Sequence, residues 1–140
     1  MKLKRGVRVC QIEELKHHER TEPRRLNALR EEIESDGLLR LSIAVDINTK
    51  VIIDGHHRVR ALEELNCTKI PVTFIDYQLP DIKVTVWRSG EIISKSDVIN
   101  AGLGTIKLPP RTSKHLVNLQ GKWKHVSAIE EQVNIPLKEL

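Results

Sequence analysis

The clearest periodic pattern of apolar residues lies near the amino-terminal end of the chain. Leu26, Leu29 and Ile33 recur at intervals of three and four residues among charged neighbours, as on one face of an α-helix. Pro23 suits the first turn of such a helix, where its missing N–H costs nothing, and Gly37 suits the end. The pattern therefore predicts a helix over 23–36.

The segments that follow alternate between strand and helix character. Two short runs rich in β-branched residues, separated by a polar turn, predict strands at 42–47 and 51–54. Beyond the second strand the apolar positions return to a helical period. This predicts a helix that begins near residue 57 and ends near Asn66.

The second half of the chain has a weaker pattern. β-Branched and aromatic residues predict strands at 69–77 and 81–87, and Pro71 indicates the start of a strand or a strand at a sheet edge. We expect a short helix at 96–101 and a last helix at 126–133. Strands and helices are thus mixed without a regular alternation, which favours the α+β class.

Composition narrows the classes of protein to which the chain can belong. Its 140 residues suffice for one domain and are too few for two ordinary ones. No window approaches the roughly 18 apolar residues of a membrane span, and the amino-terminal segment lacks the apolar stretch of a secretory signal. We therefore expect a cytoplasmic protein. Cys10 and Cys67 have neither CxxC spacing nor a disulfide framework and are expected to be buried free thiols.

The formal net charge of the chain is +4. A basic protein favours an anionic partner, which could be nucleic acid, a nucleotide or a phosphorylated metabolite. Charge alone does not choose among these partners.

One short turn concentrates charged and protonatable side chains. Asp54, Gly55, His56, His57 and Arg58 join the second predicted strand to the helix after it. Glycine permits close approach of a ligand to the backbone, and the first amides of a helix carry partial positive charge. With donors from the two histidines and the arginine, the turn suits a phosphate group. Asp54 would repel a phosphate directly, but it could hold Mg²⁺, or orient a histidine or a substrate hydroxyl.

Two other interpretations of this turn stay open. In a purely structural one, Asp54 caps the helix, both histidines lie in solvent and Arg58 is a surface charge. In the other, the adjacent histidines bind zinc. Neighbouring residues at a helix start diverge in direction, however, and the i,i+4 histidine pair of helical zinc sites is absent, which disfavours zinc.

Several stretches together resemble a known group of enzymes. VIIDGHHRVRALEEL (51–65), followed by KIPVTFIDY (69–77), is similar to the signature region of the ParB/sulfiredoxin superfamily. Within it, the DGHHR motif most resembles the free serine kinases of archaeal cysteine biosynthesis, which transfer phosphate from a nucleotide to free L-serine. LKHHERTEP (15–23), KVTVW (83–87), PPRTSKHLV (109–117) and the final NIPLKEL resemble other parts of these kinases.

The resemblance implies a fold and an activity. The fold would be a single ParB/sulfiredoxin-like kinase domain over 1–140, a small mixed sheet with flanking helices. The protein would be a phosphotransferase that makes O-phospho-L-serine from L-serine, with ATP or ADP as donor and Mg²⁺ as cofactor.

The resemblance also implies roles for individual residues. Glu19 would be the catalytic base, which a weak nucleophile such as the serine hydroxyl needs. Asp54 is a second catalytic candidate and a candidate Mg²⁺ ligand, and Trp87 would line the serine pocket. The segment 109–117 would be a phosphate-contacting loop. The expected nucleotide- or phosphate-binding residues are Gly55, His56, His57, Arg58, Thr112, Ser113, Lys114 and His115.

Departures from related proteins limit the function further. The kinases carry extra sequence between the tryptophan strand and the late basic loop, so the choice between ATP and ADP stays open. Sulfiredoxins have a catalytic cysteine where this chain has His56, which excludes their chemistry. ParB proteins carry a DNA-binding helix-turn-helix for which there is no room, so nucleic acid is not an expected partner. The alternative is a ParB-like nucleotide- or DNA-binding regulatory module without kinase activity, which would need no base at Glu19.

Overall fold

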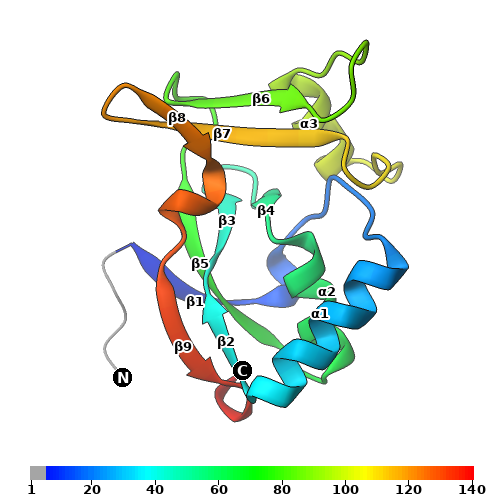
Figure 1. Cartoon of the computed structure of the whole chain (residues 1–140), viewed down its shortest axis with the longest axis vertical. Helices are drawn as coiled ribbons and strands as arrows, with labels where there is room; N and C mark the ends of the chain where they lie inside the picture. Colours follow the sequence, from blue (N-terminus) through cyan, green and yellow to red (C-terminus); the bar gives the residue numbers. More distant parts are fainter. Residues whose placement is uncertain (1–5) are drawn as a thin grey trace.

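The computed structural model of the protein describes residues 6–140 (Figure 1). Its helices are α1 (Pro23–Asp36), α2 (His56–Glu64) and α3 (Lys95–Leu103), with 3-10 turns η1 (Ile12–Glu14), η2 (Val126–Ile129) and η3 (Leu137–Glu139). Its strands are β1 (Val7–Gln11), β2 (Leu38–Leu41), β3 (Ile43–Asp46), β4 (Ile52–Asp54), β5 (Lys69–Ile75), β6 (Ile82–Val86), β7 (Ser113–Leu119), β8 (Lys122–His125) and β9 (Gln132–Pro136).

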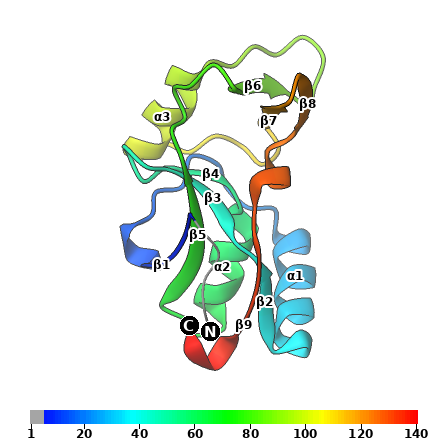
Figure 2. The same ribbon diagram turned by 90° about the vertical axis from the view of Figure 1, so that its left-hand side faces the viewer.

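The strands of residues 6–140 form three sheets. The largest has the order β1-β5-β3-β4, in which β3 and β5 run parallel and the other pairs antiparallel. β2 pairs with β9, and β6, β7 and β8 form an antiparallel sheet. Figures 1 and 2 show this last sheet and α3 at one end of the molecule, away from the carboxyl terminus, with α1 and α2 side by side beneath it. The mixed α+β class predicted from the sequence is confirmed.

Three of the four predicted helices agree closely with the structure. α1 has the predicted bounds, and Glu22 caps it by accepting a hydrogen bond from the Arg25 N–H. The helix after the DGHHR turn begins at His56, one residue before the predicted start. α3 contains the short helix expected at 96–101.

The helix predicted at 126–133 was wrong. Residues 126–133 do not form a helix, because only Val126–Ile129 makes a 3-10 turn before β9 begins. Val133 and Ile135 are buried at alternate positions of β9, so their period is that of a strand. Of the two alternatives predicted for Pro71, the start of a strand holds, because Pro71 lies near the start of β5 and β1 and β3 pair with that strand from both sides. Pro71 lies opposite Val9 of β1, before the pairing with β3 begins.

The cysteine prediction holds in part. Both thiols are free, but only Cys67 is buried, and Cys10 is half-buried. Among residues 6–140, no helix has the length and apolar character that a membrane crossing requires.

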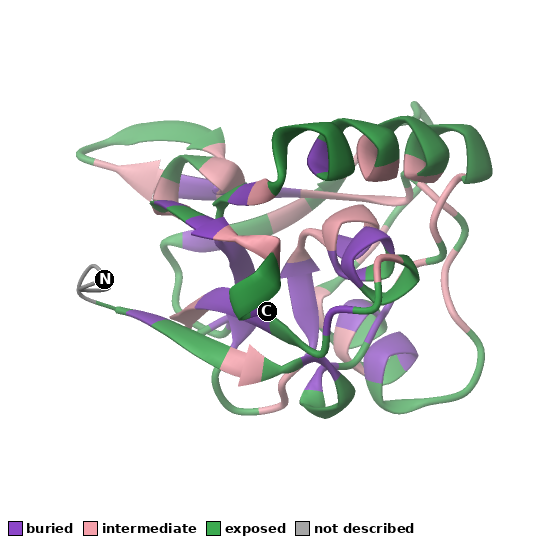
Figure 3. Ribbon diagram, turned by 90° about the horizontal axis from the view of Figure 1, so that it is seen from below, coloured by how far each residue is buried: buried purple, intermediate pink, exposed green. Residues whose placement is uncertain are grey.

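Strand β4 divides the hydrophobic core. Ile52 packs in a cluster with residues of α1, α2 and the four-stranded sheet. Val51 and Ile53, on the other face, pack in a second cluster with Tyr77, Val98 and other residues. Figure 3 shows the buried segments in the central strands and α2, whereas most of α1 is exposed. The DGHHR turn follows β4 directly, so the core fixes it from both sides.

Gly55 is required by its backbone and by its packing. Its φ is 116°, a value that favours glycine, and a Cβ built on it would lie 2.3 Å from Cγ2 of Ile43. The glycine therefore lets the turn pack on β3, whether or not a ligand also approaches it.

We predict that Gly55→Ala lowers the free energy of unfolding by at least about 2 kcal/mol, because backbone strain and overlap with Ile43 add. Gly37→Ala is the matched control. Gly37 also has positive φ but no atom within 4 Å of a built Cβ, so only the backbone cost of about 1 kcal/mol applies. Urea denaturation measures both variants, and equal losses would contradict the packing argument.

Candidate active site

A pocket of about 480 Å³ lies where α1, the DGHHR turn and β7 meet. It gathers residues that are far apart in the sequence. The residues lining it are Glu19, Arg25, Leu29, Ile53, Asp54, Gly55, His56, His57, Arg58, Trp87, Arg111, Ser113, His115 and His125.

Glu19 is held firmly in this pocket by the segment that leads into β7. Its Oε1 accepts a hydrogen bond from the Arg111 N–H at 2.7 Å. Its Oε2 accepts bonds from the N–H of Ser113 at 3.1 Å and from the Ser113 hydroxyl at 2.7 Å. The carboxylate is thus fixed by three donors, as a positioned general base requires.

The start of α2 faces the same pocket without a side-chain cap. Gly55 is the N-cap and offers no side chain to the first amides of the helix. These amides are therefore available to an anion. Nε2 of His57 accepts a hydrogen bond from the Glu22 N–H at 2.9 Å, so in neutral His57 the proton lies on Nδ1. Burial lowers the pKa of His57, which favours this neutral form.

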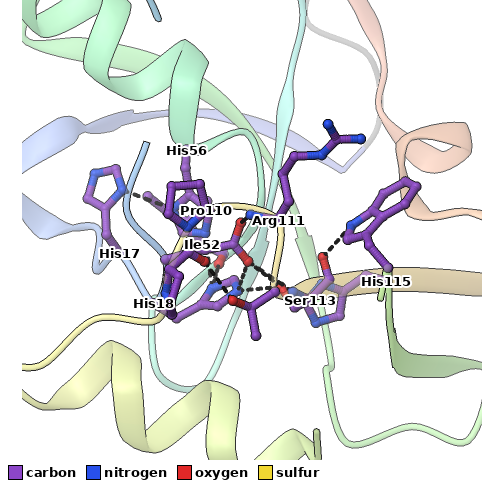
Figure 4. Close-up of polar contacts among 12 residues, drawn as sticks. His17, His18, Ile52, His56, Pro110, Arg111, Ser113 and His115 are labelled. Atoms are coloured by element: carbon purple, nitrogen blue, oxygen red, sulfur yellow. Dashed lines mark hydrogen bonds and ion pairs between the residues drawn. The ribbon is translucent and has the colours of Figure 1, made fainter. Parts of the chain in front are cut away.

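His56 does not serve as the side-chain donor that the sequence analysis expected. It is buried, its Nδ1 lies 2.9 Å from Nδ1 of His17 and its Nε2 lies 3.0 Å from Nδ1 of His18 (Figure 4). Burial lowers the pKa of His56 well below its usual value, so the ring is neutral. Only its backbone N–H, at the start of α2, is placed to contact a ligand.

Arg58 is also engaged by the protein itself. One nitrogen donates to the carbonyl of Ser42 at 2.8 Å, and the other reaches Asp54 at 3.1 Å and Glu130 at 2.9 Å. The expected role as a free phosphate donor is therefore reduced, because the guanidinium holds two carboxylates. Burial raises the pKa of Glu130 to about 9, although the nearby Arg58 opposes that shift.

The segment expected to be a phosphate-binding loop is partly a strand. Ser113 and His115 lie on β7 and line the pocket, but His115 is buried and its Nε2 is 2.8 Å from the Tyr77 hydroxyl. Thr112 and Lys114 are not among the lining residues. The Thr112 hydroxyl donates to the Pro109 carbonyl, and the Lys114 ammonium lies over the Trp87 ring.

Trp87 lies at the rim of the pocket and not in the core. It is 45% exposed, and its indole N–H donates to the Ser113 carbonyl at 3.0 Å. The Arg111 guanidinium lies over the same ring. Trp87 thus offers an apolar wall to the pocket, and the hydrogen bond to Ser113 of β7 fixes the orientation of its ring.

Sequence reasoning missed Arg25 and Glu130 near the site, and it included Arg111 only as part of the expected loop 109–117. Arg25 and Arg111 line the pocket, and each is exposed. Glu130 lies behind Arg58. Arg25 follows an N-cap and could have been suspected from its place in the first helical turn, but no local signal points to Glu130.

The residues present fit Mg²⁺ only in a limited way. Among residues 6–140, no group of three or more His, Cys, Asp or Glu side chains is arranged to hold a metal. Asp54 lines the pocket and one of its oxygens contacts Arg58. Mg²⁺ is often held by one or two carboxylates together with substrate phosphates and water, so Asp54 fits as the single protein ligand.

Comparisons with known proteins agree with this geometry. No protein-family model matches the chain. A free serine kinase solved in complex with AMP superposes with a TM-score of 0.78 at 14% identity, covering 96% of this chain and 93% of that one. The chain has the fold of a free serine kinase. The resemblance seen in the sequence is thereby confirmed at the level of fold.

Relatives found by sequence carry related names. An ATP-dependent L-serine kinase from Staphylothermus marinus is 36% identical over 80 residues, which are 54% of this chain and 32% of that protein. An ADP-dependent L-serine kinase from Thermococcus kodakarensis is 28% identical over 81 residues, covering 55% of this chain and 34% of that protein. A ParB-like protein from Sulfolobus acidocaldarius is 47% identical over 45 residues, 32% of this chain and 23% of that protein. The matched segment thus spans about a third or less of each relative.

The raised pKa of Glu130 gives a testable dependence of stability on pH. The folded protein binds this proton more tightly than the unfolded chain, so the stability that this group contributes is present below the ordinary glutamate pKa of about 4.5 and is lost as pH rises towards about 9. Glu130→Gln cannot ionise and should lose less stability between about pH 5 and about pH 8 than the wild type. Urea denaturation at both pH values measures this. Glu34→Gln, on the exposed face of α1, is the control, and identical pH dependence in all three proteins would contradict the assignment.

Proposed function

We propose that this protein is a free serine kinase that transfers a phosphoryl group from ATP or ADP to the hydroxyl of L-serine, giving O-phospho-L-serine. One observation carries the proposal: a single pocket contains both a fixed carboxylate, Glu19, and the uncapped start of α2. The names of the relatives and of the solved structure support it. The product would serve cysteine biosynthesis, and the location would be the cytoplasm.

The proposed mechanism assigns the proton to Glu19. Phosphoryl transfer depends mainly on positioning and on neutralising the charge of the phosphates. Glu19 takes the proton of the serine hydroxyl as the serine oxygen attacks the terminal phosphorus of the donor, and the bridging oxygen of the donor leaves with the rest of the nucleotide. The three donors to Glu19 keep the carboxylate in place during this transfer.

The phosphates of the donor would lie at the start of α2. The first amides of the helix and Nδ1–H of His57 can donate to them, and Arg25 and Arg111 supply positive charge from two other sides. Asp54 would hold Mg²⁺, which supplies charge neutralisation at the phosphates when bound. The serine side chain would lie against Trp87.

A second candidate function is nucleotide or DNA binding without phosphoryl transfer. The short match to a ParB-like protein favours it. Such a module needs no base, whereas Glu19 is anchored here by three hydrogen bonds. The kinase therefore has the stronger support.

We expect purified protein to form O-phosphoserine only when L-serine, a nucleotide and Mg²⁺ are all present. Chromatographic detection of phosphoserine tests this with ATP and ADP in turn, and with homoserine and threonine as competing acceptors. Folded protein that binds nucleotide but yields no phosphoserine with either donor would leave the binding module as the function.

Glu19→Gln should lower kcat by about a hundred- to ten-thousandfold with little change in nucleotide affinity, because the amide cannot take the proton. Two backbone N–H groups face the carboxylate, so a thermal melt must accompany the assay. Asp54→Asn is the comparison, and added Mg²⁺ should rescue it in part but not Glu19→Gln. A Glu19→Gln enzyme within about threefold of wild type would make Asp54 the leading base.

Arg25→Ala should weaken nucleotide binding by about two- to fivefold, because an exposed arginine at the pocket rim contributes one screened contact to phosphate. Arg24→Ala is the matched control, since Arg24 is also an exposed arginine of α1 but does not line the pocket. Arg58 is unsuitable for this test because its removal leaves the buried Glu130 unpaired. Calorimetry showing equal affinity for both variants would place the phosphates elsewhere.

A further inference from the structure

A chain of hydrogen bonds leads from Glu19 into the protein interior. The Ser113 hydroxyl lies 2.7 Å from Oε2 of Glu19 and 2.9 Å from Nε2 of His18 (Figure 4). Nε2 of His18 is 3.8 Å from the same Oε2, too far for a direct hydrogen bond. Ser113 is therefore the bridge between the two titratable groups.

The position of the proton on His18 is fixed by its surroundings. Nδ1 of His18 lies 2.7 Å from the carbonyl oxygen of Ile52, which can only accept, so Nδ1 carries a hydrogen. His18 is fully buried, and burial lowers its pKa to about 4, which keeps the ring neutral near pH 7. In the neutral ring Nε2 then has no hydrogen and can only accept.

The hydrogen-bonded chain from Glu19 through Ser113 to His18 has one hydrogen too few when Glu19 is ionised. When Glu19 is ionised, Ser113 has one hydroxyl hydrogen and an acceptor on each side, Glu19 Oε2 and His18 Nε2. Only one of these two short contacts can then be a hydrogen bond. When Oε2 of Glu19 is protonated, it donates to Ser113, Ser113 donates to His18, and both contacts are satisfied.

We propose that Ser113 and His18 are positioning residues that stabilise Glu19 in the protonated form it adopts during phosphoryl transfer. The inference rests on the proposed function. In this step the serine O–H bond breaks, an Oε2–H bond forms on Glu19, and the serine oxygen bonds to phosphorus as the donor's bridging oxygen leaves. The Ser113 hydroxyl keeps its own hydrogen and rotates from Glu19 towards His18, so no charge moves into the interior.

We call the chain of hydrogen bonds from Glu19 through Ser113 to His18 the relay. In it, Ser113 has a role different from phosphate binding. A phosphate contact would contribute to nucleotide affinity, whereas the relay contributes to turnover. Glu19 retains two backbone donors, from Arg111 and Ser113, when the hydroxyl is removed. The hydroxyl is therefore not required merely to keep the carboxylate in place.

The first experiment separates an effect on turnover from an effect on binding, and it begins once the wild-type protein has been shown to make phosphoserine. Ser113→Ala should lower kcat roughly ten- to a hundredfold while KM for nucleotide and serine stays within about threefold, and Ser113→Thr should restore turnover. A Ser113→Ala enzyme with unchanged kcat, or one with only a raised KM for nucleotide, overturns the relay. Wild type that makes no phosphoserine is a failure of the proposed function and is seen before any variant is made.

A double-variant cycle with His18 tests the far end of the relay. His18→Asn should also lower kcat. The double variant Ser113→Ala/His18→Asn should be no slower than the slower single variant, because each substitution interrupts the same chain of hydrogen bonds. Full additivity would overturn the proposal. If His18→Asn does not fold, ¹⁵N NMR of histidine-labelled wild type decides: the relay requires neutral His18 with its hydrogen on Nδ1, and a hydrogen on Nε2 overturns it.

Discussion

The guanidinium of Arg58 is the interaction on which the arrangement of the site depends. It joins the first turn of α2 to the carbonyl of Ser42 before β3, to Asp54 at the end of β4 and to Glu130 before β9. Asp54 and the carboxyl group of Glu130 share this one cation, and burial raises the pKa of Glu130. Burying this set without its partners would cost several kcal/mol, so the turn, both strands and the carboxy-terminal segment must come together as one unit. The DGHHR motif is therefore as much a structural element as a binding element.

The site separates neutral groups from charged ones by depth. His17, His18, His56 and His115 are buried, and burial lowers the pKa of each, so the interior beside the pocket carries hydrogen-bonding groups without positive charge. The cations Arg25 and Arg111 lie at the exposed rim. Phosphates drawn by the rim would thus meet neutral histidines further in, beside the charged side chains of Arg58, Glu19 and Asp54.

The sequence predicted the local elements better than their partners. The period of Leu26, Leu29 and Ile33 was enough to place α1, because a helix depends on neighbours three and four residues away. The local pattern of apolar residues was insufficient for β9. The apolar residues of 126–133 also fit a short helix, and it is the pairing with β2 that selects the strand. Strand pairing is non-local, and so is the environment of His56, whose partners come from the segment before α1. The motif could be found without a structure, but not which of its side chains point inward.

The hydrogen bond from the Glu22 N–H to Nε2 of His57 ties the beginning of α1 to the beginning of α2. Glu22 is also the residue that caps α1, so one imidazole lone pair supports the starts of both helices. A charged imidazolium has no lone pair on Nε2 and cannot accept that bond. Acid strong enough to charge His57 would therefore break this one bond between the two helix starts, on the side of the pocket that Arg25 lines.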